Sequence, residues 1–150
     1  MKLPKIINKL LVKYGLKEDE YKLYLQSYHY QRAIELRNQG KDGDAFEELK
    51  LEIKEHPQNG HAHLLVAEIH FDHQVLGTAL QACNTALDIL LDTEDKESIS
   101  HAYNIRCQTQ RALGEKEKWR ADAEAACKFD AKRVDALGEL GDYYYYSDDF

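Results

Sequence analysis

The sequence contains few residues that interrupt helices. It has two prolines and eight glycines in 150 residues, and no stretch alternates apolar and polar residues as a half-buried strand does. Proline removes a backbone donor and glycine weakens a helix interior, so their scarcity favours helices throughout. We therefore predict an all-α protein, and the length suits a single domain with its own hydrophobic core.

Long apolar runs and an excess of basic residues are also missing. No run of about 18 or more apolar residues occurs, so we expect no membrane span. The formal net charge of −7 argues against a nucleic-acid partner, which requires a basic surface, and favours a basic or neutral partner. The first residues, MKLPKIINKLLVKYGLK, lack the apolar core and cleavage site of a signal peptide.

The cysteines do not form a disulfide framework. There are three of them, Cys83, Cys107 and Cys127, and none forms a close pair in the sequence. Each falls on the apolar face of a predicted helix, where a free cysteine packs as a small hydrophobic residue. We therefore expect a reducing, cytoplasmic setting.

Small residues recur at fixed intervals along the chain. A step of 34 residues relates Ala33 to Ala67 and Ala45 to Ala79. A step of 40 residues relates Ala67 to Cys107, Cys83 to Ala123 and Ala86 to Ala126. Repeats of this length predict a solenoid of helical hairpins, because each hairpin buries its apolar face only by stacking on a neighbour.

The longer step needs an insertion, and the polar segment 91–98 can hold it. This segment, LDTEDKES, is acidic and separates two predicted helices. We assign the six additional residues to a loop here, and we expect Ser98 or Ser100 to cap the next helix. Gly77 is expected near the turn of the preceding hairpin. Trp119 stands where the repeat calls for a small residue, so we expect the third hairpin to splay.

This pattern resembles the tetratricopeptide repeat, which places a large residue, Leu-Gly, Tyr, Ala, Phe, Ala and Pro at set offsets. The residues that carry the resemblance are Ala33, Leu36, Ala45, Leu49 and Pro57; Ala67, Ala79, Cys83 and Ala86; Tyr103, Cys107, Gly114, Ala123 and Ala126; and Leu137, Leu140, Gly141 and Tyr144. The resemblance implies a right-handed α-solenoid of about three and a half repeats in one domain, 1–150. The expected repeats are 26–59, 60–99 and 100–133.

Both ends of the chain leave alternatives open. Residues 1–16 form an amphipathic helix that either caps the first repeat or docks on a membrane surface or a partner. Residues 134–150 correspond to the first helix of an incomplete repeat, rich in tyrosine. Either the chain is a fragment of a longer repeat protein, or a neighbouring copy covers this helix through self-association.

The resemblance also implies a binding site, because the first helices of such repeats line a concave groove. The inward positions of each first helix are spaced three, four and three apart, which makes one helical stripe. Carried over, these positions are His61, Leu64, Glu68 and Phe71; His101, Asn104, Gln108 and Arg111; and Asp135, Gly138, Asp142 and Tyr145. We therefore predict a protein–protein interaction scaffold or adaptor that binds a peptide segment in this groove.

One known use of such a groove is not expected here. The carboxylate clamp of this family holds the C-terminal acid of a heat-shock chaperone with lysine, asparagine and arginine side chains. The matching places hold Tyr30, Ile34, Leu64 or Leu65, His101 and Ile105. The charge-assisted donors of the clamp are therefore missing, which argues against a co-chaperone of that type.

Two further functions stay open as alternatives. A small acidic chaperone of the secretion type, holding an unfolded client, would share this general architecture. A metal-dependent site could be built on His61, His63, His70 and His73, although structural zinc needs four convergent ligands and no cysteine clusters with them. Nucleophile elbows, phosphate loops and dinucleotide turns are missing, so we expect no enzyme and no cofactor.

Overall fold

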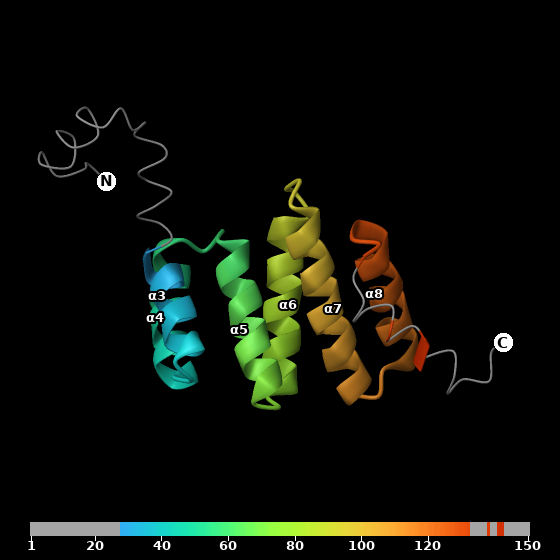
Figure 1. The fold of residues 1–150 in the computed structure, drawn as a ribbon, viewed down its shortest axis with the longest axis horizontal. Helices are drawn as coiled ribbons and strands as arrows, with labels where there is room; N and C mark the ends of the chain where they lie inside the picture. The colour runs from blue at the N-terminus through green and yellow to red at the C-terminus, as the bar shows by residue number, and fades with distance from the viewer. Residues whose placement is uncertain (1–27, 133–137, 139–140, 143–150) are drawn as a thin grey trace, which may run out of the picture. The chain divides into compact units, whose positions relative to one another are not determined.

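The computed structural model describes residues 28–132, 138 and 141–142. Six helices lie in the continuous part: α3 (Tyr28–Asn38), α4 (Asp42–Glu55), α5 (Gly60–Asp72), α6 (Leu76–Leu90), α7 (Lys96–Ala112) and α8 (Lys116–Phe129) (Figure 1). No strand occurs among the described residues, and none of their helices is both long and apolar enough to cross a bilayer. The predicted all-α class is confirmed. Segment 1–16 lies outside the described residues, as does 134–150 apart from Gly138, Gly141 and Asp142.

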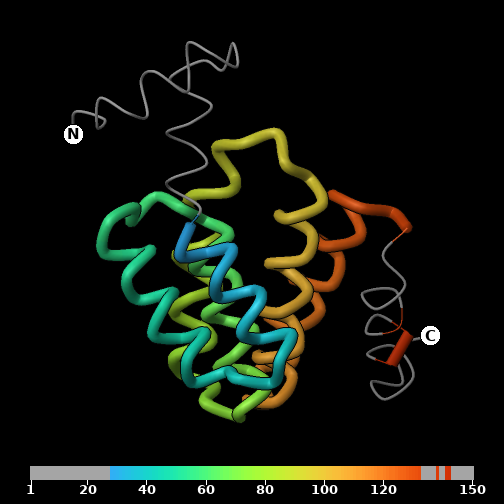
Figure 2. Tube along the Cα trace, turned by 60° about the vertical axis from the view of Figure 1, so that its left-hand side comes forward, coloured from blue at the N-terminus to red at the C-terminus, as the bar shows by residue number. Residues whose placement is uncertain are grey.

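The chain divides into two compact units, Met1–His56 and Pro57–Phe150. In the first unit α3 packs on α4. In the second, α5 packs on α6, α6 on α7 and α7 on α8, so that two hairpins stack in chain order. Figure 2 shows the α6–α7 connection, in yellow, at the opposite end of these helices from the α5–α6 turn. The helices thus form an all-α helical repeat solenoid, whose right-handed course and repeat boundaries stay predictions.

The small residues that set the repeat spacing are all buried. Each of the following has no exposed surface: Ala33, Ala45, Ala67, Ala79, Cys83, Ala86, Cys107, Ala123 and Ala126. A short side chain lets the backbones of two helices approach closely, and a longer one would hold them apart. The spacing read from the sequence therefore marks the contacts between helices.

All three hairpin turns share one backbone geometry. Gly40, Gln74 and Gly114 have positive φ values of 75°, 62° and 78°, and they are spaced 34 and 40 residues apart. In each turn the following amide donates to a carbonyl five residues back, from Lys41, Val75 and Glu115, over 2.8 to 2.9 Å. This is a Schellman motif, which normally carries glycine at the left-handed position. Gly77 lies near the α5–α6 turn, as expected, in the first turn of α6, while Gln74 holds the left-handed position.

The insertion between the second and third hairpins is mostly helix, which corrects the prediction of a longer loop. Four of the six additional residues make α7, which starts at Lys96, longer than α5 at its N-terminus. One more makes α6 longer than α4, and the last makes the α6–α7 connection longer than the α4–α5 connection. Asp95 caps α7 by accepting a hydrogen bond from the Ser98 amide at 3.1 Å. The expected caps do other things: Ser98 lies inside the first turn, and Ser100 is buried and donates to the Ala126 carbonyl at 2.7 Å.

The third hairpin does not splay, contrary to the expectation from Trp119. Helix α7 packs on α8 at least as extensively as α5 packs on α6. Trp119 lies in the first turn of α8 and is half-buried, with the Arg111 guanidinium 4.7 Å from its ring centroid. Because Trp119 lies at the end of the helix pair, its ring can stack against the Arg111 guanidinium at the edge of the contact, and it does not separate the helices.

An ion pair with a buried carboxylate joins α7 and α8 in the second unit. Asp122 on α8, only 4% exposed, accepts from Arg106 Nε at 2.9 Å and from Arg106 Nη2 at 2.7 Å. Arg106 also donates from Nη1 to Asn84 Oδ1 on α6 at 3.0 Å. The hydrogen bonds to Asp122 raise the pKa of Arg106. The planar guanidinium donates in fixed directions, so its contacts with Asp122 and Asn84 fix the register of α6, α7 and α8.

Candidate functional site: the face of α5 and α7

The first helices of the last two complete hairpins, α5 and α7, contact each other directly. Six of the predicted site residues stay half-buried on these helices, and we call them the α5–α7 face: His61, Glu68, Phe71, His101, Gln108 and Arg111. Leu64 and Asn104 are 5% and 1% exposed. They therefore belong to the packing of the helices and offer no surface to a ligand.

The remaining predicted residues belong to the C-terminal segment. Asp135 and Tyr145 lie outside the described residues. Gly138 is exposed. The side chain of Asp142 is 52% exposed and accepts from Arg111 Nη1 at 3.1 Å. Arg111 thus contacts both a carboxylate and the Trp119 ring, at the C-terminal end of α7.

The centre of the α5–α7 face is a hydrogen-bonded pair of side chains, one from each helix. His101 Nε2 on α7 contacts Glu68 Oε1 on α5. Their side chains remain 33% and 24% exposed, so the pair is accessible from one side. The face therefore carries a carboxylate that the fold holds in place.

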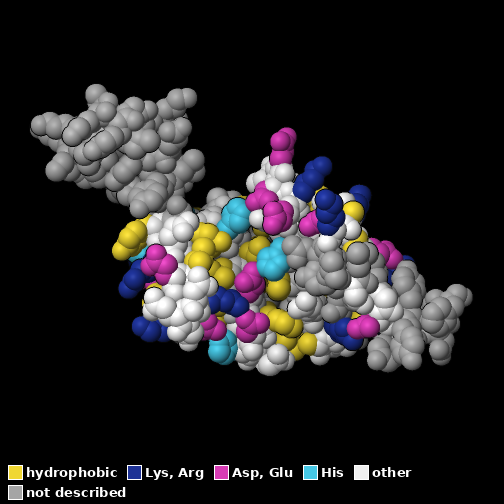
Figure 3. Space-filling model, viewed as in Figure 1, with side chains coloured by type: hydrophobic (Ala, Val, Ile, Leu, Met, Phe, Trp, Pro, Cys, Tyr) yellow, Lys and Arg dark blue, Asp and Glu magenta, His cyan; other side chains and the backbone are white. Residues whose placement is uncertain are grey.

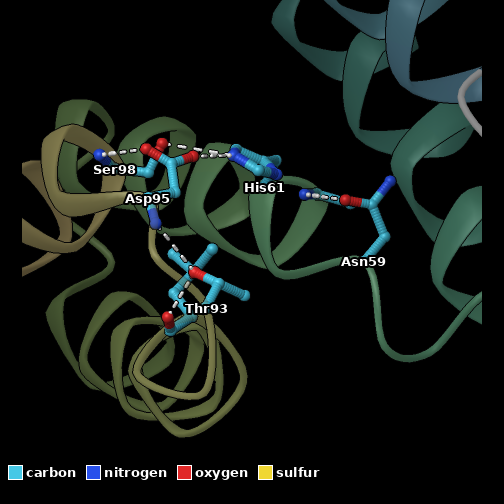
Figure 4. Close-up of polar contacts among 7 residues, drawn as sticks. Asn59, His61, Thr93, Asp95 and Ser98 are labelled. Atoms are coloured by element: carbon cyan, nitrogen blue, oxygen red, sulfur yellow. Dashed lines mark hydrogen bonds and ion pairs between the residues drawn. The ribbon is translucent and has the colours of Figure 1, made fainter.

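The N-terminal end of the same face holds a second pair (Figure 4). His61 Nε2 lies 2.9 Å from Asp95 Oδ2 and 3.1 Å from Ser98 Oγ. Hydrogen bonds from the Ser98 hydroxyl and amide, and then from His61, lower the pKa of Asp95. The connection is braced further by Thr93, which donates from its hydroxyl to the Leu90 carbonyl at 2.6 Å and accepts from the Asp95 amide at 3.3 Å.

These three residues do not make a catalytic triad, although a serine, a histidine and an aspartate meet. In a Ser-His-Asp relay the carboxylate binds one ring nitrogen and the hydroxyl binds the other, so that the proton crosses the ring. Here Asp95 and Ser98 both face Nε2 of His61. The cluster therefore positions a carboxylate and caps a helix, and it has no geometry for activating a nucleophile.

The histidine-rich segment does not converge on a metal site in the described part of the chain. His63 Nε2 donates to the Pro57 carbonyl at 2.9 Å, while His61 faces Asp95. Burial, and then the nearby His73, lower the pKa of His70. No group of three or more histidine, cysteine, aspartate or glutamate side chains gathers with metal-binding geometry among these residues.

The cysteines are placed as the sequence indicated. Cys83 and Cys107 are buried, Cys127 is half-buried, and all three are thiols that form no disulfide. Burial raises the pKa of the Cys83 thiol to about 12. A thiol with so high a pKa is a poor nucleophile near neutral pH, which fits packing and not chemistry.

The clamp positions keep the character that the sequence predicted. Leu65 and Ile105 are each 8% exposed, and Tyr30 and Ile34 are half-buried on α3. None of these side chains is a charge-assisted donor for a terminal carboxylate.

Asp95, Ser98 and Trp119 join the face although sequence reasoning did not place them there. Asp95 could have been recognised as a cap from the sequence, because aspartate is as strong an N-cap as serine. Its contact with His61 could not, since it joins residues 34 apart in different hairpins. In Figure 3, histidine side chains lie next to acidic side chains over α5 and α7.

Comparisons with known proteins identify the fold. No family model matches the sequence, and no curated protein matches it. Among solved structures, the first tetratricopeptide-repeat domain of Spaghetti (RPAP3), bound to the HSP90 peptide SRMEEVD, is similar at 20% identity and a TM-score of 0.73. The similarity covers 81% of this chain and 91% of that one.

A second solved structure gives the same result. The second tetratricopeptide-repeat domain of human RPAP3, in complex with the HSP70 peptide SGPTIEEVD, is 22% identical with a TM-score of 0.68. This similarity covers 80% of this chain and 96% of the RPAP3 domain. Together with the buried small residues at their 34- and 40-residue spacing, these similarities show that the chain has a tetratricopeptide-repeat-like fold.

Proposed function

We propose that this protein is a protein–protein interaction scaffold that binds a peptide segment on the α5–α7 face. The observation that carries the proposal is the face itself: six side chains on consecutive first helices remain half-buried, while Leu64 and Asn104 beneath them are packed. Polar and aromatic side chains on a rigid helical frame suit a peptide, because the backbone and the side chains of the peptide both find partners.

The similar structures support the peptide as the type of ligand. Both RPAP3 domains are bound to short chaperone peptides. We infer a different ligand for this protein, because the clamp positions hold Tyr30, Ile34, Leu64 or Leu65, His101 and Ile105. A free C-terminal acid would lack the ammonium, guanidinium and amide donors that hold a carboxylate.

The test is a selection from a phage-displayed library of random dodecapeptides against the whole chain. A selected peptide is then titrated into the isotopically labelled protein, and the amide shifts are followed by NMR. The proposal expects the largest shifts in α5 and α7, and an affinity that changes in Glu68→Ala and in Arg111→Ala. A side chain that contributes strongly at the centre of an interface is worth more than about 1 kcal/mol, which is a change of about fivefold or more.

The chain offers a matched control on a second helix. Arg120 and Glu124 form an ion pair on α8, with Nε and Oε1 3.3 Å apart and both side chains exposed. Arg120→Ala and Glu124→Ala remove the same residue types away from α5 and α7, and they should bind like the original protein. Equal binding by the face variants and these control variants would refute the proposed site.

The remaining functional predictions concern residues outside the described part. Docking of 1–16 and self-association through 134–150 stay predictions, as does the alternative of a secretion-type chaperone.

A further inference from the structure

We propose that the occupant of the α5–α7 face is an extended, basic peptide segment with lysine or arginine at every third residue. This inference rests on the proposed function and names the chemistry of its ligand. It is drawn from the carboxylates of the face, from the distance between them and from the scarcity of apolar side chains.

The fixed charges of the face are mainly negative. Counting the six residues and the acidic side chains that contact them, Glu68, Asp95 and Asp142 contribute carboxylates, and Arg111 contributes a guanidinium that Asp142 contacts at 3.1 Å. Hydrogen bonds from Ser98 lower the pKa of Asp95, so this carboxylate is ionised at neutral pH. The net charge of −7 on the whole chain has the same sign. A basic ligand is therefore attracted at long range and at contact, and an acidic one is repelled.

The carboxylates are held in place and still accessible. Asp95 keeps 39% of its side chain exposed while binding His61, and Glu68 keeps 24% exposed while binding His101. A carboxylate offers about four acceptor positions, so a bound histidine does not exhaust it. An ammonium or guanidinium group can thus add to either pair, and the carboxylate needs no reorganisation because the histidine already orients it.

The spacing of the two pairs selects the form of the ligand. His61, which marks the position of Asp95, and Glu68 lie seven residues apart on α5, a rise of about 10 Å. A polyproline II segment rises about 3.1 Å per residue with three residues per turn, so every third side chain is on one side, about 9 Å from the next. Basic residues three apart therefore reach both carboxylates from one edge of an extended chain.

A helical ligand fits less well. A helix in a groove is held by an apolar stripe at its i, i+3 or i+4 and i+7 positions. Among the six residues that define the α5–α7 face, Phe71 alone is apolar, and Leu64 is 5% exposed. Trp119, which joins the face from α8, has the Arg111 guanidinium 4.7 Å from its ring centroid. The face lacks the apolar floor that a helix needs.

The experiment measures which peptides the library selection enriches and how charge controls their binding. The inference expects enriched sequences with lysine or arginine three residues apart. Affinity, measured by fluorescence anisotropy with one enriched peptide, should fall as salt rises from about 0.05 M to about 0.5 M.

The variants remove negative charge and leave the fold in place. Glu68→Gln keeps the length of the side chain, and Asp95→Asn keeps an N-cap, since asparagine caps as well as aspartate. Each should weaken binding of the basic peptide roughly 1.5-fold to fivefold, the range for a single exposed ion pair. Glu124→Gln, the same change on α8, should leave the affinity unaltered.

The outcomes separate this inference from the function on which it rests. Acidic or uncharged enriched peptides that still lose affinity in Phe71→Ala and Arg111→Ala would overturn the basic ligand and keep the peptide site. Basic residues seven apart would overturn the extended form in favour of a helix. No enrichment above background, or peptides that bind all variants equally, would overturn both proposals.

Discussion

The α5–α6 turn carries a residue that its geometry disfavours. Gln74 adopts a φ of 62°, at the position where the other two hairpins have Gly40 and Gly114. For a residue with a Cβ the left-handed conformation is unfavourable by about 1–2 kcal/mol, and for glycine it is almost neutral. We therefore expect Gln74→Gly to stabilise the protein.

The magnitude follows from three contributions. Relief of the left-handed strain stabilises the folded protein by about 1–2 kcal/mol. The greater conformational freedom of glycine in the unfolded chain destabilises it by about 0.5–1 kcal/mol. The hydrogen bond from Gln74 Nε2 to the Phe71 carbonyl, at 3.3 Å and exposed to water, contributes little. The net stabilisation should be about 0.5–1 kcal/mol.

The assay is urea unfolding of the whole chain followed by circular dichroism, with two comparison variants. Gln74→Ala removes the side chain but keeps the strain, so it should match the original protein. Gly114→Ala should cost about 0.5–1 kcal/mol, because it is the reverse change, and a Cβ added at Gly114 would meet no other side chain or backbone atom within 4 Å. If Gln74→Gly is no more stable than Gln74→Ala, the strain argument is wrong.

Three other predictions concern the second unit. Asp122→Ala leaves the half-buried Arg106 guanidinium without its carboxylate, and it should lower the unfolding free energy by about 2–3 kcal/mol in urea unfolding. Asp95→Ala removes the α7 cap and should cost about 1 kcal/mol at neutral pH. The folded pKa of Asp95 lies below its unfolded value of 3.8. The stability difference between Asp95→Ala and the original protein should therefore be largest above pH 3.8 and should disappear as pH falls through the folded pKa. In thiol titration with an aromatic disulfide at about pH 8, half-buried Cys127 should react first and Cys83 only on unfolding.

Each of these expectations has a result that contradicts it. A double-mutant cycle with Asp122→Ala and Arg106→Ala should give a coupling energy well above zero, and additive losses would mean that the pair does not interact. A pH-independent difference between Asp95→Ala and the original protein would show that the carboxylate charge does not support the cap. Rapid reaction of all three thiols in the folded protein would contradict the burial of Cys83.

Much of the candidate site could be anticipated, but its surface could not. The stripe spacing placed His61, Glu68 and Phe71 on one side of α5, because positions three and four apart share a face. Burial depends on how closely α5 and α7 approach, which no local pattern states. Leu64 and Asn104 therefore follow the stripe in sequence and yet are enclosed by the packing.

The sequence by itself determined the helices and their repeat, because a small side chain at a fixed interval is a steric requirement that can be read residue by residue. The ends of those helices were less certain, since Asp95, Ser98 and Ser100 are all competent caps and only the packed structure selects Asp95. Tertiary structure alone decided which charges meet. The contact of His61 with Asp95, and that of His101 with Glu68, join different hairpins, and their existence depends on the stacking distance between α5 and α7.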